Sequence, residues 1–413
     1  MEFAGARVWV LIGPTPADAG SYHAVLSRIA EGGPANRVGL QPQRDRRDWR
    51  FEPRLPPSVV AGDIDFDPTD VDATMTQLAS RTVDQPIVAG NIAGHLALCI
   101  DHGIGDAHAI AEIAAALTRP GAPLPSGYLP PQQDLNVTRP LARVAYRMLA
   151  AGPVGIARDV THELNAAKTR RAASETAGRS GGVPSVSPSS GYSTIFIRSQ
   201  PGFLPAVREL RDRRYRGTSV ATLVFYALRR SLAQCLEDCG AHLAPTTGLL
   251  TDLRRYLRPG EATLANLSMV AQAVTPRGQT LADFGASVTR ATGAHSSYPA
   301  TRTLAVCAMR ALRPPARALG PGVADGRDGN IEVTFSDVSR LPSLRKFQYR
   351  SDSRDRITAV ALPPGARNQL TIALVTVGDE LQLTATYFPD VIPAEPLRAA
   401  LNQGLTFDVL ATV

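Results

Sequence analysis

Cysteine is scarce in this chain, and its spacing excludes the usual cysteine-built sites. There are four cysteines among 413 residues: Cys99, Cys235, Cys239 and Cys307. Cys99 lies inside an apolar run, where a buried free thiol is expected rather than a disulfide. Cys235 and Cys239 are one helical turn apart, but no second pair exists to complete a zinc site. We therefore expect no metal site and a reducing compartment.

Long apolar runs and nucleic-acid signatures are absent as well. The first residues, MEFAGAR, contain no charged region followed by an apolar core of signal-peptide length, and no stretch reaches the length of a membrane span. The chain has no zinc-finger spacing, no aromatic–basic pattern of an RNA-recognition strand and no lysine-rich tail. We expect a cytoplasmic monomer with no integral membrane association and no nucleic-acid partner.

The composition favours two folded units. Hydrophobic residues make up 44% of the chain, which is ample for a core, and 413 residues exceed one ordinary domain. A small, polar segment rich in glycine, serine and proline occupies 172–192, near the middle of the sequence. We therefore predict an N-terminal lobe over 1–172, a flexible linker over 173–192 and a C-terminal lobe over 193–413.

Hydrophobic periodicity alternates between strand and helix in both halves, which predicts an α/β fold. Strands are predicted at 7–12, 36–40, 49–52, 95–101, 193–198, 249–253, 331–336, 357–361, 369–377 and 380–387. Helices are predicted at 16–31, 69–80, 107–117, 139–170, 201–215, 218–238, 279–298, 301–318 and 394–405.

The formal net charge is +7, and arginine carries most of the positive charge. Arginines gather at 208–216 and 340–356. Such patches are commonly solvated helix faces, and they also suit an acidic partner such as phosphates or an acidic carrier protein.

Polar residues interrupt the apolar pattern in LALCIDHGIGDAHAIAEI, residues 97–114. His102 follows a predicted buried strand, and an imidazole is a natural general base near neutral pH. Gly103 and Gly105 allow a tight turn and close approach of a substrate. Asp106 could hold the loop or simply cap the next helix, and a loop histidine is often only solvated. The residues alone leave these alternatives open.

The stretch Asp101–Ala107 resembles the HHxxxDG signature of the condensation-domain superfamily. That superfamily includes nonribosomal peptide condensation domains, polyketide-associated acyltransferases, plant BAHD acyltransferases and chloramphenicol acetyltransferase. The stretch 251–257 followed by Asn266, the stretch 334–343 and the stretch 370–401 are similar to further family segments, in the same order. Asp101 replaces the first motif histidine, Ala107 replaces a glycine, and Asp337 stands where asparagine is usual.

This resemblance implies two chloramphenicol-acetyltransferase-like lobes that form a V-shaped pseudo-dimer with a tunnel between them. It implies His102 as the general base, Asp106 as a structural residue and Arg254 as its salt-bridge partner. Ser336 is the candidate oxyanion donor. The candidate substrate-binding residues are Asp101, Gly105, Asn266 and Asp337.

The implied reaction is transfer of an acyl group from acyl-CoA, or from the phosphopantetheine thioester of a carrier protein, to a hydroxyl or amine of a small molecule. No tightly bound cofactor is expected, and the setting would be specialised or lipid metabolism. Two alternatives stay open. One is a free-standing condensation enzyme of the nonribosomal peptide type. The other is a degenerate condensation-like domain that binds a carrier protein or catalyses a different reaction.

Overall fold

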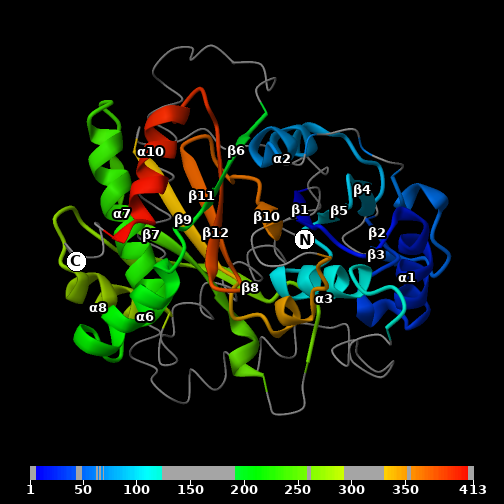
Figure 1. Cartoon of the computed structure of the whole chain (residues 1–413). Helices are drawn as coiled ribbons and strands as arrows, with labels where there is room; N and C mark the ends of the chain where they lie inside the picture. Colours follow the sequence, from blue (N-terminus) through cyan, green and yellow to red (C-terminus); the bar gives the residue numbers. More distant parts are fainter. Residues whose placement is uncertain are drawn as a thin grey trace, which may run out of the picture.

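The computed structural model describes residues 6–42, 49–61, 64, 67, 69–122, 191–257, 262–292, 330–350 and 355–407. Within these ranges the chain forms a four-stranded sheet, a six-stranded sheet and a two-stranded ribbon, with helices on the faces of the two large sheets (Figure 1). This confirms the predicted α/β class. The predicted helices at 139–170 and 301–318 lie outside the described residues, as does the predicted linker except for Gly191 and Tyr192.

The four-stranded sheet has the order β10-β1-β5-β4, and all its neighbours are antiparallel. Its strands are β10 (Ile357–Ala361), β1 (Arg7–Gly13), β5 (His95–Asp101) and β4 (Ile87–Ile92). Successive side chains of β1 alternate between two packed faces, as the pleat of a strand requires. One face packs against α1 (Ala19–Glu31) and α3 (Ala107–Leu117), and the other against α2 (Val71–Ser80). Burial on both faces explains the unbroken apolar runs in β1 and β5.

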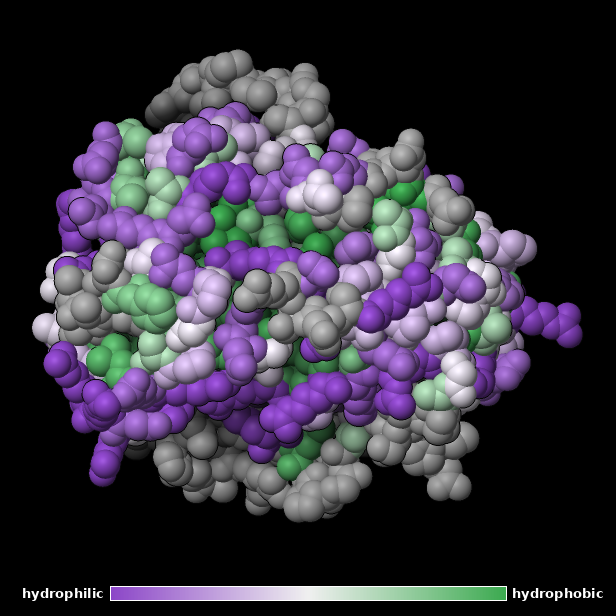
Figure 2. All heavy atoms as spheres, in the orientation of Figure 1, coloured by the Kyte–Doolittle hydropathy of each residue, from purple (hydrophilic) through white to green (hydrophobic). Residues whose placement is uncertain are grey.

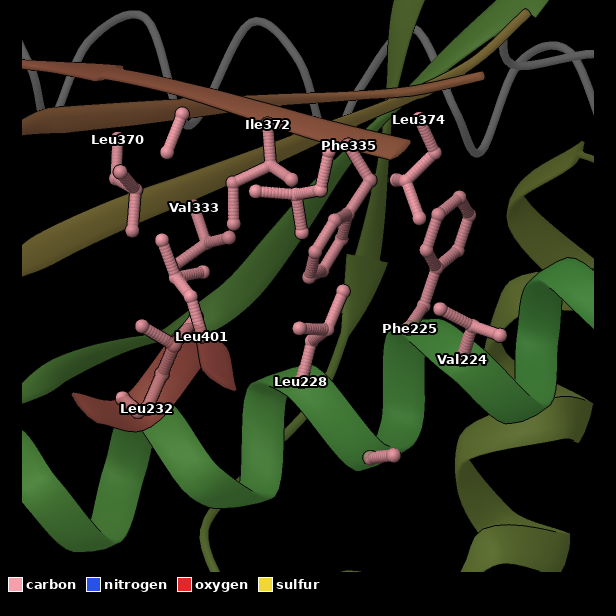
Figure 3. Close-up of a cluster of buried hydrophobic side chains, with 14 of the residues drawn as sticks. Val224, Phe225, Leu228, Leu232, Val333, Phe335, Leu370, Ile372, Leu374 and Leu401 are labelled. Atoms are coloured by element: carbon pink, nitrogen blue, oxygen red, sulfur yellow. The ribbon is translucent and has the colours of Figure 1, made fainter. Parts of the chain in front are cut away.

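The six-stranded sheet has the order β6-β12-β11-β9-β7-β8. Its strands are β6 (Ser193–Arg198), β12 (Glu380–Tyr387), β11 (Gln369–Val377), β9 (Ile331–Asp337), β7 (Leu243–Asp252) and β8 (Ser268–Val274). Its core is closed by α6 (Phe203–Arg214), α7 (Val220–Glu237), α8 (Leu281–Thr292) and α10 (Ala394–Gly404). Phe225 of α7 stacks on Phe335 of β9 with ring centroids 4.5 Å apart, at the centre of this core (Figure 3).

A strand from the C-terminal half completes the N-terminal sheet. The division at 173–192 assigns 357–361 to the C-terminal lobe, whereas β10 pairs with β1 and lies between the two lobes in Figure 1. Its amides reach across to β12: Thr358 N donates to Gln382 Oε1 at 2.8 Å, and Val360 N donates to Thr384 Oγ1 at 3.1 Å. This exchange joins the two sheets through hydrogen bonds as well as apolar packing.

Local sequence patterns missed or misplaced several elements. The strand predicted at 36–40 is wrong, because Pro34–Asn36 forms a 3-10 turn and the ribbon strand β2 begins only at Leu40 (Leu40–Pro42), paired with β3 (Trp49–Phe51). The strands β4 and β8 were not predicted, since glycine, asparagine, alanine and glutamine weaken their local strand signal. No described helix has the length and apolarity needed to cross a bilayer. The face shown in Figure 2 is largely hydrophilic, with small separate apolar areas.

Candidate active site

Hydrogen bonds to backbone carbonyls hold the loop that carries His102, residues 101–106. The chain leaves β5 at Asp101, and His102 N donates to the carbonyl of Ala6 at 2.8 Å. His102 Nδ1 lies 2.9 Å from the carbonyl oxygen of Gly105. A carbonyl oxygen can only accept, so Nδ1 carries the hydrogen of this bond. In the neutral ring, Nε2 is therefore the nitrogen that carries no hydrogen, which is the form required of a proton acceptor.

Asp106 and Arg254 form a bidentate ion pair across 148 residues of sequence. Arg254 Nη1 lies 2.7 Å from Asp106 Oδ2, and Nη2 lies 3.0 Å from Oδ1. The same carboxylate accepts the amide of His108 at 3.1 Å, as the N-cap of α3, and the amide of Leu267 at 2.9 Å. Both readings of Asp106 are thus realised together: it caps the helix, and it ties the loop to the other half of the chain.

The guanidinium of Arg254 has a full set of acceptors. It lies in the 3-10 turn Leu253–Tyr256 that follows β7. Besides Asp106, it donates to the carbonyls of Thr263 and Ala265 at 2.9 and 2.8 Å and to Asp252 Oδ1 at 3.2 Å. Burial alone would lower the pKa of Arg254, but the carboxylates of Asp106 and Asp252 together outweigh that effect and the pKa is raised. A buried pair satisfied in this way is stable as a pair and costly to break singly.

Arg37 is a second cation that contacts the loop, and sequence reasoning missed it. Its Nε donates to the carbonyl of Ile104 at 2.5 Å, and its Nη2 reaches the carbonyl of Gly103 at 3.4 Å. Burial lowers the pKa of Arg37 to about 10, so it stays charged at neutral pH. Arg37 directly follows a Pro-Ala-Asn turn, and its own φ is positive at 69°. It lies 67 residues before Ile104 in the sequence, so only the fold brings it to this loop. No local sequence signal marks it.

An apolar cavity lies between the two sheets and reaches His102. Its volume is about 40 Å³ for the centres of water-sized spheres, and 15 of the 18 described residues that line it are apolar. The three polar ones are His102, Ser336 and Thr358. Ser336 lies in β9 and is 2% exposed. The structure therefore brings the predicted base and the predicted oxyanion donor to one cavity, although they come from different sheets.

The four residues predicted to bind substrate do not line this cavity. Asp101 is buried, accepts the amide of Gly103 at 2.8 Å and faces Arg7 at 3.9 Å. Asn266 donates to the carbonyl of His102 at 3.3 Å. Asp337 accepts the amide of Ser339 at 3.0 Å and lies on the wall of a neighbouring cleft. Both Asp101 and Asn266 hold the loop through these bonds.

Gly105 is packed rather than open to a ligand. A Cβ atom at this position would lie 2.4 Å from Ala109 Cβ and 2.8 Å from the carbonyl oxygen of Leu264. Glycine is therefore required by the close approach of α3 and of residue 264. The same close approach keeps the Gly105 carbonyl within reach of His102.

We expect Gly105→Ala to lower the free energy of unfolding by about 1–3 kcal/mol, because the added methyl group overpacks a site walled partly by backbone. Thermal melting measures this. Gly121→Ala is the matched control, since nothing lies within 4 Å of a Cβ there. Equal melting temperatures for the two variants would contradict the packing argument.

A wide cleft lined by several arginines adjoins the cavity. Its volume is about 540 Å³ for the centres of water-sized spheres. Asp337 is the single acidic residue among the described residues that line it, and four of these residues are arginines: Arg208 from α6, and Arg340, Arg345 and Arg356 from the segment between β9 and β10. The two arginine-rich stretches of the sequence thus meet on one cleft. Among the described residues, no ion pair joins Arg208, Arg340 or Arg345 to a carboxylate.

A buried carboxylate on α3 anchors the wall shared by cleft and cavity. Glu112 is 2% exposed, accepts a hydrogen bond from Ser343 Oγ and pairs with Lys346 Nζ at 3.1 Å. Ser343 and Lys346 belong to the 3-10 turn Pro342–Lys346, whose Leu344 lines both spaces. Sequence reasoning missed this contact, because Glu112 reads as an ordinary helix residue until its partners 231 and 234 positions away are known.

Comparison with known proteins gives the architecture a precedent. No family model and no curated protein sequence match this chain. Among solved structures, the first condensation domain of the calcium-dependent antibiotic synthetase is similar with a TM-score of 0.57 and 16% identity, covering 99% of this chain and 91% of that one.

Two further structures extend the comparison. The trichothecene 15-O-acetyltransferase of Fusarium sporotrichioides is similar with a TM-score of 0.55 and 10% identity, covering 98% of this chain and 91% of that one. With the nonribosomal peptide synthetase FmoA3, the match covers 95% of this chain but 39% of the synthetase chain, with a TM-score of 0.52 and 16% identity. The chain therefore has the two-lobed fold of condensation domains and of the chloramphenicol-acetyltransferase-like acyltransferases.

Proposed function

We propose that the protein is an acyltransferase that moves an acyl group from a thioester donor to a hydroxyl or amine acceptor, with His102 as general base. One observation carries the proposal: His102 is fixed through Nδ1 to the Gly105 carbonyl, beside a cavity between the two sheets. An imidazole whose Nδ1 donates to a carbonyl, in a residue that lines a mainly apolar cavity, is suited to proton abstraction through Nε2.

In this mechanism Nε2 of His102 takes the proton of the acceptor O–H or N–H as the acceptor attacks the thioester carbonyl carbon. A C–O or C–N bond forms, the C–S bond breaks, and the imidazolium returns its proton to the leaving thiolate. The Gly105 carbonyl stabilises the imidazolium by accepting from Nδ1. The Ser336 hydroxyl would donate to the oxyanion that forms on the carbonyl oxygen.

The donor would be acyl-CoA or the phosphopantetheine thioester of a carrier protein. The arginine cleft supports either one, since both bring phosphate, and cationic side chains around a concave surface raise the local concentration of an anionic substrate. No covalent enzyme intermediate is needed, because the acceptor attacks the donor directly.

The test supplies acetyl-CoA and hexanoyl-CoA with panels of alcohols and amines, and measures release of free thiol together with acylated product by mass spectrometry. The proposal requires release that depends on both the acceptor and His102. A parallel assay with an acyl carrier protein loaded with the same chains identifies a carrier-dependent donor. Carrier binding without thiol release, unchanged in His102→Ala, would instead identify a non-catalytic recruitment domain.

We expect the double variant Arg340→Ala/Arg345→Ala to weaken CoA binding by about five- to tenfold, because each exposed charge contributes at most about 1 kcal/mol. Titration calorimetry at low salt measures this, and raising the salt concentration should reduce the difference by screening. Arg290→Ala on the outer helix α8 is the control for a general change in net charge. Equal CoA affinities in the double variant and in wild type would remove the cleft from the donor site.

A further inference from the structure

We infer that the group accepted beside His102 is an uncharged, apolar acyl chain, and that Ala111 of α3 sets how much chain the cavity admits. This inference rests on the proposed function and names its substrate class more closely. It separates transfer of a simple acyl chain from condensation of aminoacyl or peptidyl groups, whose donors carry an amine or a peptide.

Among the described residues that line the cavity, no carboxylate is present to receive an ammonium group. Apart from His102, its 18 lining residues include no Asp, Glu, Lys or Arg, and the other two polar groups are the hydroxyls of Ser336 and Thr358. An α-ammonium placed here would lose its hydration without a counter-charge, which is strongly unfavourable. A methylene chain gains by the same transfer out of water.

The cavity lies directly beside the arginine cleft. Four residues line both spaces: Leu344, Phe347, Thr358 and Val375. A thioester donor has an anionic end and an acyl end. The arginine cleft suits the anionic end, and the apolar cavity suits the acyl end. In the bound donor the phosphates therefore remain among the arginines. The acyl chain extends past the four shared residues into the apolar space beside His102.

Helix α3 makes room for this chain by presenting small residues. Ala107, Ala111 and Ala114 line the cavity at helical spacings of four and three, together with Ile110. Ser336 stands on the sheet side, buried and without a hydrogen-bond partner among the described residues, so its hydroxyl is free for a ligand. Ala111 is 5% exposed, and a larger side chain there would project into the space rather than into solvent.

The experiment measures binding of thioethers that cannot transfer their alkyl group. S-methyl-, S-butyl- and S-(3-aminopropyl)-CoA are titrated into the full chain, and the same three thioethers of 4′-phosphopantetheine are tested for a carrier-type donor. Three added methylenes should tighten binding at least about tenfold from methyl to butyl. The aminopropyl probe, similar in size to butyl but charged, should bind no more tightly than methyl.

In Ala111→Phe the affinity for the butyl probe should fall close to the affinity for the methyl probe, which itself should stay as in wild type. Ala111→Val gives an intermediate ratio and covers the case in which the phenyl ring impairs folding. Ala282→Phe, on the exposed face of α8, is the matched control. Equal affinities of wild type for the methyl and butyl probes, or tighter binding of aminopropyl than of butyl, would overturn the inference. Either result would leave binding of a thioester donor intact. Failure of every probe to bind overturns it together with the thioester donor.

Discussion

His102→Ala should lower acyl-transfer turnover by about 10²–10⁴ without lowering the melting temperature appreciably. Nδ1 of the imidazole donates to the Gly105 carbonyl. The substitution removes the proton acceptor and leaves no buried charge without its partner. The loop keeps its other bonds, from Arg37 to the carbonyls of Gly103 and Ile104 and from Asn266 to the carbonyl of residue 102. The paired measurement is steady-state thiol release and thermal melting on the same preparations.

His102→Asn is the sharper control, because its side-chain amide can take the place of Nδ1 and donate to the Gly105 carbonyl while offering no base. It should preserve the loop and still lose turnover to the same extent. Wild-type turnover in either variant would exclude His102 as the base. Partial activity in the asparagine variant alone would assign the imidazole a positioning role.

Asp106→Ala should lower the free energy of unfolding by about 3–5 kcal/mol and abolish activity through loss of the loop. The substitution leaves the Arg254 guanidinium, 14% exposed, facing a vacated site, and it removes the acceptor for the amides of His108 and Leu267. Chemical denaturation measures the change in unfolding free energy.

Asp252→Ala is the matched control, since Asp252 contacts the same guanidinium at 3.2 Å but its carboxylate is 52% exposed. It should cost at most about 1 kcal/mol. In the double variant Asp106→Ala/Arg254→Met the apolar side chain removes the stranded charge, so part of the lost stability should return. Equal costs for Asp106→Ala and Asp252→Ala would show that burial of the Asp106–Arg254 pair has no special weight.

Features that depend on neighbouring residues could be predicted from the sequence. The apolar run of β5, the glycine-containing turn and the Asp106 cap of α3 lie within 23 residues, so periodicity and turn chemistry define them before any tertiary contact forms. The resemblance to the condensation-domain superfamily supplied the two-lobed architecture and the pairing of Asp106 with Arg254. That pairing did not follow from local pattern.

The sequence by itself determined the strand–loop–helix unit that carries His102 and Asp106, together with an α/β class, because these follow from short-range periodicity and capping. Only the tertiary structure decided what the unit faces. The insertion of β10 beside β1, the convergence of Arg208 with the arginines of 340–356, and the approach of Ser336 to the His102 cavity join segments more than a hundred residues apart. Such contacts depend on which faces bury each other, and periodicity identifies an apolar face without naming its partner.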